Sequence, residues 1–430
     1  MDLIVRRARL PDGRAEMDIA IKDGRIVAVE PALQAEAARE IDAAGHLVAP
    51  PFVDSHFHMD STLTAGNPRH NESGTLLEGI RIWGELKPDL TQEKIFERAM
   101  SYCDMAVARG LLAIRSHVDV CDPRLLAVDA LLEVRKQVAP YLDLQLVAFP
   151  QDGFLRAPQA KDLLAEALRR GVDVVGGIPH FERTQADGAE AVKQLCEIAA
   201  ERSLPVDMHC DESDDPHARF VENLAYETRR LGLQGRVTGS HLTSMHSMDN
   251  YYFTKLIHLM VEAELKVIAN PLINVTLQGR QDTYPKRRGL TRVPELMGAG
   301  LRVAMGHDCV MDPWYALGSG DMLEVAHMGA HVAHMTGRAE IEACFAAVTE
   351  TPARILELEG YGLAPGCHGD LVVLEAADPV DAVRLRGARL AVVRRGRVVA
   401  ESPPTAAKLD LPGRPGEVRF TGHDQPSQTP

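Results

Sequence analysis

The sequence predicts an α/β protein: a (β/α)8 barrel of the TIM type joined to a small β-sandwich domain formed from both chain ends. Three observations support this prediction. Eight short apolar runs recur between residues 46 and 308, longer amphipathic stretches separate them, and β-rich segments occupy the two ends of the chain. We expect residues 1–49 with 360–402 to form the small domain, and residues 50–359 to form the barrel.

Both ends of the chain contain short β-rich segments separated by residues typical of tight turns. MDIAIKDGRIVAVE contains Asp23-Gly24, a pair typical of a hairpin turn, and ARLAVVRRGRVVAE contains Arg395-Gly396. Two such pieces at opposite ends predict one β domain assembled from both. Residues 403–430 are rich in Pro, Gly, Ser and Thr, so we expect an extended or disordered tail.

The eight central runs alternate with amphipathic stretches, as βα units around a parallel sheet do. A doubly wound open sheet is the alternative, but no GxGxxG motif opens a helix after the first run. In order, the runs read HLVAPPFVDSHFH, LLAIRSHV, LDLQLVAFPQ, VDVVGGIPH, LPVDMHC, RVTGSHL, LKVIANPLI and LRVAMGHD.

Polar residues collect at the C-terminal ends of these runs, and in a barrel those ends converge on one mouth. His56 and His58 are two residues apart on a strand, so both imidazoles can point inward and share a metal. The full set is His56, His58, His117, Gln151, His180, His209, Glu212, His241 and Asp308.

The composition and charge of the chain argue against a nucleic-acid-binding protein, a disulfide-rich protein and a membrane protein. The 430 residues carry a formal net charge of −14, which argues against nucleic-acid binding because polyanions need a basic surface. Seven cysteines without a CxxC pair fit unpaired thiols. We expect no membrane span and no signal peptide, hence a cytoplasmic protein.

The strand-end residues resemble those of the amidohydrolase superfamily, whose barrel carries HxH, His, His and Asp on strands one, five, six and eight. The resemblance to the bacterial cytosine deaminase subgroup covers nearly the whole chain. It rests on HFHMDSTLTAGNPRHNESGTLLEGI, VAFPQDG, GGIPHFE, DMHCDESDD, GSHLTSMH, NPLINVTLQGRQDTYPKRRGLTRV and GHDCVMDPWYALG.

The resemblance implies that His56, His58, His209 and Asp308 ligate one divalent metal per subunit, Zn²⁺ or Fe²⁺. Members with two metals use a carboxylated lysine on strand four, and VDVVGGIPH has no lysine. No role is assigned to His117 or His180. The resemblance also implies a homo-oligomer.

The reaction that the resemblance implies is the hydrolytic deamination of cytosine to uracil plus ammonia, and Cys309, discussed below, leads us to expect that 5-methylcytosine is also converted, to thymine. A hydroxide formed at the metal is expected to attack ring carbon C4. In this scheme Asp308 accepts a proton, His241 orients the hydroxide, and Glu212 protonates ring nitrogen N3.

The resemblance also suggests how the small-molecule pyrimidine is bound. Gln151 is expected to hold the O2/N1 edge, aided by backbone groups near Leu76, although a strand-capping amide is the alternative. Phe149 and Trp314 are candidate walls for the flat ring, unless either belongs to the core.

Cys309 departs from the bacterial cytosine deaminases, which carry a second acidic residue after the strand-eight aspartate. A thiol is smaller and less polar than a carboxylate, so room for a 5-methyl group is expected. The alternative is a neutral exchange. A nucleophilic role is disfavoured, because Asp308 raises the pKa of an adjacent thiol.

Two other functions remain open. The barrel and its metal residues also suit a deaminase of another ring, such as isoguanine, another purine or a triazine. A non-catalytic barrel scaffold is the second alternative, but such a protein would be expected to lose metal-binding residues.

Overall fold

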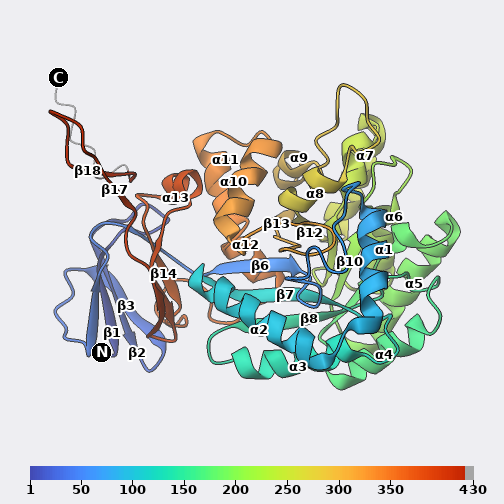
Figure 1. Ribbon diagram of the computed structural model, residues 1–430, viewed down its shortest axis with the longest axis horizontal. Helices are drawn as coiled ribbons and strands as arrows, with labels where there is room; N and C mark the ends of the chain where they lie inside the picture. Colours follow the sequence, from blue (N-terminus) through green and yellow to red (C-terminus); the bar gives the residue numbers. More distant parts are fainter. Residues whose placement is uncertain (422–430) are drawn as a thin grey trace.

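Eight parallel strands form the barrel in the computed structural model, which describes residues 1–421 (Figure 1). They follow one another around the sheet in chain order, as the alternating runs predict. The ring closes through a bridge between Phe57 and Asp308, so the barrel prediction is confirmed. The strands are β6 (Phe52–Phe57), β7 (Leu111–Asp119), β8 (Asp143–Phe149), β9 (Val174–Gly177), β10 (Val206–Cys210), β11 (Val237–His241), β12 (Lys266–Ala269) and β13 (Arg302–Met305).

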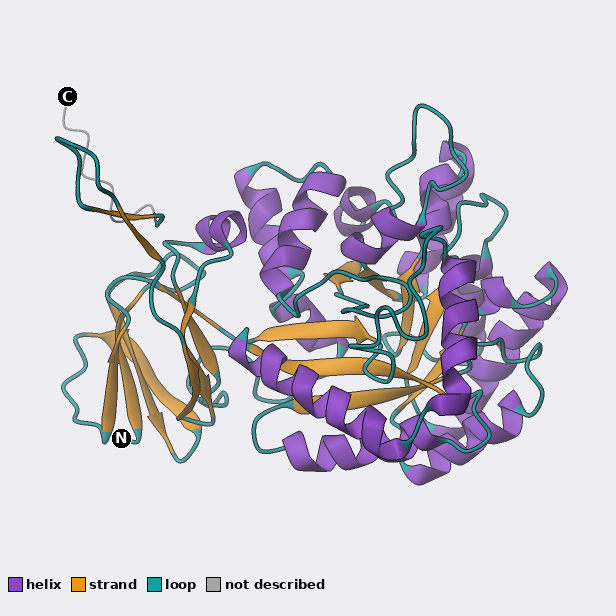
Figure 2. Cartoon of the chain, viewed as in Figure 1, coloured by secondary structure: helices purple, strands orange, loops and turns teal. Residues whose placement is uncertain are grey.

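Helices surround the strands (Figure 2). Each turns an apolar face inward; in α5, for example, Val192, Leu195 and Ala199 are buried at helical spacing. The helices are α1 (Leu76–Leu86), α2 (Gln92–Ala108), α3 (Leu126–Val138), α4 (Ala160–Arg170), α5 (Gln185–Arg202), α6 (Phe220–Arg230), α7 (Asn250–Glu262), α8 (Pro271–Leu277), α9 (Val293–Gly298), α10 (Met322–Val332), α11 (Arg338–Ala346) and α12 (Glu350–Ile355). Three short 3₁₀ turns, η1 (Lys87–Asp89), η2 (Pro179–Phe181) and η3 (Thr243–Ser247), lie between them.

The β domain consists of two four-stranded sheets, in the orders β3-β2-β1-β4 and β16-β15-β14-β5. Side chains of both sheets, including Ile19, Ile21, Val373 and Val393, share one apolar core. Both predicted hairpin turns are present. The elements are β1 (Leu3–Ala8), β2 (Met17–Lys22), β3 (Arg25–Pro31), β4 (Arg39–Asp42), β5 (Leu47–Ala49), β14 (Leu371–Leu374), α13 (Pro379–Leu385), β15 (Arg389–Arg394) and β16 (Arg397–Glu401).

The first apolar run of the sequence is two strands rather than one. Leu47–Ala49 pairs with β14 in the β domain, and the chain enters the barrel only after Pro50-Pro51. Proline lacks an N–H donor, so two in succession end the pairing. This crossing ties the small domain to the first barrel strand.

Residues 406–419 of the predicted tail form a short antiparallel ribbon, β17 (Ala406–Lys408) with β18 (Glu417–Arg419), which projects from the β domain (Figure 1). The rest of the predicted tail, residues 422–430, lies outside the described residues. Among residues 1–421 we find no helix with the length and apolarity to cross a membrane.

Candidate active site

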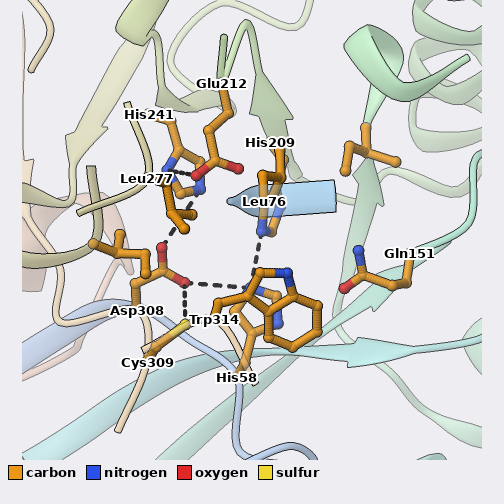
Figure 3. A pocket seen from close by; sticks show the side chains of 12 residues that line it. His58, Leu76, Gln151, His209, Glu212, His241, Leu277, Asp308, Cys309 and Trp314 are labelled. Atoms are coloured by element: carbon orange, nitrogen blue, oxygen red, sulfur yellow. Dashed lines mark hydrogen bonds and ion pairs between the residues drawn. The ribbon is translucent and has the colours of Figure 1, made fainter. Parts of the chain in front are cut away.

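The C-terminal ends of the barrel strands surround a cavity (Figure 3). Residues from eight separate stretches of the chain meet there, as expected when parallel strands close into a barrel. Nine of the eleven residues that were assigned a site role from the sequence line the cavity, and His56 and Phe149 do not. The lining comprises His58, Leu76, Gln151, Ile178, His209, Glu212, His241, Ile273, Leu277, Asp308, Cys309 and Trp314.

The four predicted metal ligands lie close together: His58, His209 and Asp308 line the cavity, and His56 lies next to them. His58 Nε2 is 2.9 Å from His209 Nε2 and 3.4 Å from Asp308 Oδ1. His56 Nε2 lies 3.6 Å from the same Asp308 oxygen. Two overlapping groups could hold a cation, each with its ligand atoms within 4.8 Å of one another: His56, His58, His117 and His209, and His56, His209, His241 and Asp308.

The chemistry of these residues fits a divalent metal. His56 is fully buried, and neither of its ring nitrogens has a hydrogen-bond partner among the described residues. Buried polar atoms normally have partners, so a ligand for them is expected. Burial and neighbouring histidines lower the pKa of His56 and His209 well below the ordinary value. The rings are therefore neutral near pH 7, with lone pairs available to a cation such as Zn²⁺ or Fe²⁺.

His241 is held by two asparagines that the sequence reasoning missed. The Asn274 side chain accepts the backbone N–H of Asn270 through Oδ1, so its Nδ2 faces His241 Nδ1 at 2.9 Å. Nδ1 is thus an acceptor, and His241 Nε2 lies 3.8 Å from Asp308 Oδ2. A signal was present, because Asn270 directly follows β12 at the end where the other strands carry site residues.

The two carboxyl groups that were predicted to be catalytic, those of Glu212 and Asp308, are both buried. Glu212 Oε1 lies 3.4 Å from His241 Nδ1, and burial raises the pKa of Glu212 to about 8. Burial, together with the nearby Glu212, raises the pKa of Asp308 well above its usual range. Asp211 fixes the turn before Glu212 by accepting the backbone N–H groups of Phe220 and Val221, both at 2.9 Å.

Gln151 and Trp314 line the part of the cavity beside His58 (Figure 3). The Trp314 ring centroid is 6.2 Å from that of His58. The Trp314 ring packs directly against α1 at Gly79. Any larger residue at that position would clash, because an added Cβ would lie only 2.3 Å from Trp314 Cδ1. Leu76, the first residue of α1, also reaches the cavity.

Phe149 lies elsewhere than predicted. Its ring is fully buried and stacks on His209 with a centroid distance of 4.1 Å and an interplanar angle of 17°. It is therefore the apolar backing of His209 and no part of the cavity wall. The end of β8 explains the difference: Phe149 is the last residue of the strand, and the turn that follows redirects the chain, so Phe149 and Gln151 do not share a face as they would within a strand.

Cys309 lies in the cavity wall with 2% of its surface exposed, and its Sγ is 3.5 Å from Asp308 Oδ1. Burial and the adjacent Asp308 raise the thiol pKa well above its ordinary value. A neutral thiol is a small, weakly polar wall group and a poor nucleophile.

The two unassigned histidines lie outside the cavity lining, although His117 belongs to one of the two groups that could hold a cation. The His117 ring is 4.1 Å from that of His56, and its Nε2 is 3.7 Å from Asp207 Oδ1. His180 belongs to η2 and is half-buried, and the desolvation of its ring lowers its pKa to about 4. Neither residue lines the cavity.

The model of the amidohydrolase family matches residues 39–400. Among solved structures, the chain is similar to the 5-methylcytosine deaminase from Klebsiella pneumoniae liganded with 5-fluorocytosine. The identity is 42% with a TM-score of 0.91, over 94% of this chain and 98% of that one.

Two curated relatives are more distant. The N-isopropylammelide isopropyl amidohydrolase of Pseudomonas sp. (strain ADP) is 28% identical over 93% of this chain and 97% of its own length. The pterin deaminase of Rhizobium rhizogenes is 28% identical over 93% of this chain and 91% of its own length.

Proposed function

Since the chain belongs to the amidohydrolase family, we propose that it is a metal-dependent deaminase that converts cytosine and 5-methylcytosine to uracil and thymine, with release of ammonia. The observation that carries the proposal is the content of one cavity: a free glutamine amide lies in the same cavity as a buried glutamate, a histidine and the candidate metal ligands. The likeness to the Klebsiella 5-methylcytosine deaminase, at 42% identity, supports the ring assignment.

Hydrolysis joins water to ring carbon C4, breaks the bond from C4 to the exocyclic nitrogen, and releases that nitrogen as ammonia. His56, His58, His209 and Asp308 would hold the metal, which, when bound, supplies hydroxide near neutral pH by lowering the pKa of water. The free Asp308 oxygen accepts the proton left on the attacking water.

The remaining proton transfers fall to the opposite side of the cavity. Glu212 gives its proton to ring nitrogen N3, which makes C4 more electrophilic. It then takes up the proton that Asp308 accepted from the attacking water and delivers it to the amino group, which leaves as ammonia. His241 orients the attacking water through Nε2, because Asn274 already occupies Nδ1.

Recognition of the ring depends on Gln151. Its amide offers a donor for the ring oxygen O2 and an acceptor for the N1 hydrogen, a pairing that a pyrimidine edge satisfies. Trp314 flanks the ring, and Cys309 leaves room beside C5 for a hydrogen or a methyl group. One methyl group is worth about 1–3 kcal/mol in such a pocket, so we propose a broadened preference rather than an absolute switch.

We also propose one Zn²⁺ or Fe²⁺ per subunit, a homo-oligomeric assembly and a cytoplasmic location. A single metal is supported by β9, which carries no lysine. The seven free cysteines fit a reducing compartment.

The test is to measure kcat/KM for ammonia release from cytosine and from 5-methylcytosine side by side, with metal-supplemented protein. Turnover of both bases is the expected result. Ammonia release from cytosine but not from 5-methylcytosine would show that the cavity does not accept the 5-methyl group. If neither base reacts while isoguanine, another purine or a triazine does, the ring assignment is wrong.

A further inference from the structure

The side-chain amide of Gln151 is not fixed by hydrogen bonds of its own. The residue is 4% exposed at the cavity wall, and its amide has no hydrogen-bond partner among residues 1–421. Only its backbone is bound locally, through its N–H to Phe149 O at 3.0 Å. The position of the amide therefore depends on the turn of residues 150–157 that carries it.

One side of this turn is tied to η1 by Lys87. The Lys87 ammonium lies 2.6 Å from Asp152 Oδ2 and 2.7 Å from Asp119 Oδ2. The same Asp119 oxygen accepts the indole N–H of Trp83 on α1 at 2.8 Å. The Lys87 side chain is 14% exposed, so solvent screens these pairs only in part.

The other side of the turn folds around the carboxylate of Glu182, which follows η2. Glu182 Oε1 accepts the N–H groups of Phe154 at 2.6 Å and Leu155 at 3.0 Å, and Oε2 accepts that of Arg156 at 2.9 Å. Three backbone donors on one buried carboxylate give the turn a single geometry, since charge-assisted hydrogen bonds are stronger than neutral ones.

We propose that Lys87 and Glu182 are positioning residues for substrate recognition, which hold the Gln151 amide at the distance that reads the pyrimidine edge. Lys87 acts on the residue next to Gln151, and Glu182 acts on the three residues that complete the turn. The inference rests on the proposed function, because it takes Gln151 as the group that contacts the ring.

Substitution of Lys87 or Glu182 is expected to weaken substrate binding and leave the chemical step unchanged. A displacement of about 1 Å in a positioning group costs up to about 10²-fold in efficiency. An edge contact made equally in the bound substrate and in the transition state changes KM and leaves kcat nearly constant. We therefore expect Lys87→Met and Glu182→Gln to raise KM for cytosine by about tenfold, with kcat within about threefold of the wild type.

The variants have conservative and surface controls. Lys87→Arg keeps the charge and is expected to retain KM within about threefold. In Glu182→Gln, an NH₂ group faces a backbone donor in place of one carboxylate oxygen, with no change in size. Lys193→Met and Glu190→Gln alter a half-exposed pair on α5, 3.9 Å apart, and are expected to leave KM unchanged. Thermal melting confirms that each variant is folded.

A double-mutant cycle with Gln151→Ala separates positioning from a merely structural role. If Lys87 and Glu182 act through Gln151, neither substitution raises KM more than about twofold in the Gln151→Ala background. Additive increases in that background, or an unchanged KM in both single variants, would overturn the inference while the proposed function stands. A wild-type protein that releases no ammonia from either pyrimidine would overturn the proposed function itself, and this inference with it.

Discussion

Replacing Cys309 by aspartate tests how the cavity distinguishes two rings that differ by one methyl group. The thiol forms part of the wall, 3.5 Å from Asp308 Oδ1, and is almost completely buried. A carboxyl group is larger and more polar, so it takes space and apolar contact from a 5-methyl substituent. We expect Cys309→Asp to lower kcat/KM for 5-methylcytosine relative to cytosine.

The size of the effect follows from the value of one methyl group. A loss of about 1–3 kcal/mol corresponds to a fall of about 5- to 150-fold in the ratio of the two kcat/KM values. The new carboxyl group would share a proton with its neighbour, because two carboxylates about 4 Å apart repel each other by about 4 kcal/mol at an effective dielectric constant of 20. A lower Tm is expected alongside the change in specificity.

The assay follows ammonia release from both bases at several concentrations, with Cys309→Ser as the matched control. Serine keeps the size of the side chain and adds no charge, so its ratio should stay within about threefold of the wild type. A folded Cys309→Asp protein with an unchanged ratio would refute the reasoning that this side chain makes room for the methyl group.

Three further perturbations test the chemistry of the site. Glu212→Gln should lower kcat by about 10²–10⁴-fold with little change in KM, because the amide cannot shuttle a proton; normal kcat would exclude Glu212 as the donor. Dialysis against a chelator should abolish activity and lower Tm, with recovery on adding one equivalent of Zn²⁺ or Fe²⁺, whereas elemental analysis showing two metals per chain would contradict the mononuclear site. Asn274→Ala should lower kcat about tenfold, because it leaves His241 Nδ1 with only the longer contact to Asn270 Nδ2, at 3.3 Å, and the loss of a buried hydrogen bond costs about 1–3 kcal/mol. ¹⁵N NMR of His241 should show a changed tautomer, and an unaltered spectrum would contradict this role for Asn274.

The proximity of the candidate metal ligands could be predicted from the sequence because two periodic rules determine their positions, whereas the choice of these four among the strand-end residues came from the resemblance to the amidohydrolase superfamily. Side chains two apart on a strand share a face, which brings His56 and His58 together. Parallel strands end at the same mouth, which adds His209 and Asp308. Neither rule needs knowledge of side-chain packing.

The surroundings of these residues could not be predicted in the same way. Whether Phe149 faces the cavity depends on the turn after β8, and that turn depends on Glu182, which is distant in sequence. The hydrogen bond from Asn274 to His241 joins α8 to β11, and no local pattern specifies such a pair. The sequence therefore predicts the helices and strands, but not the side-chain contacts between them.

The seam of the barrel, where the end of β6 meets the segment after β13, lies at the candidate metal ligands. Its closing hydrogen bonds run from His58 N to Asp308 O, at 3.0 Å, and from Asp308 N to His56 O, at 2.8 Å. The residues that close the ring are thus the candidate metal ligands, and Asp308 holds a left-handed φ of 70° there. Such a conformation is unfavourable for a residue with a side chain and persists only where its surroundings enforce it. A metal bound by these side chains would therefore also stabilise the hydrogen bonds that close the barrel, and we expect amide hydrogen exchange of His58 and Asp308 to slow when the metal is added.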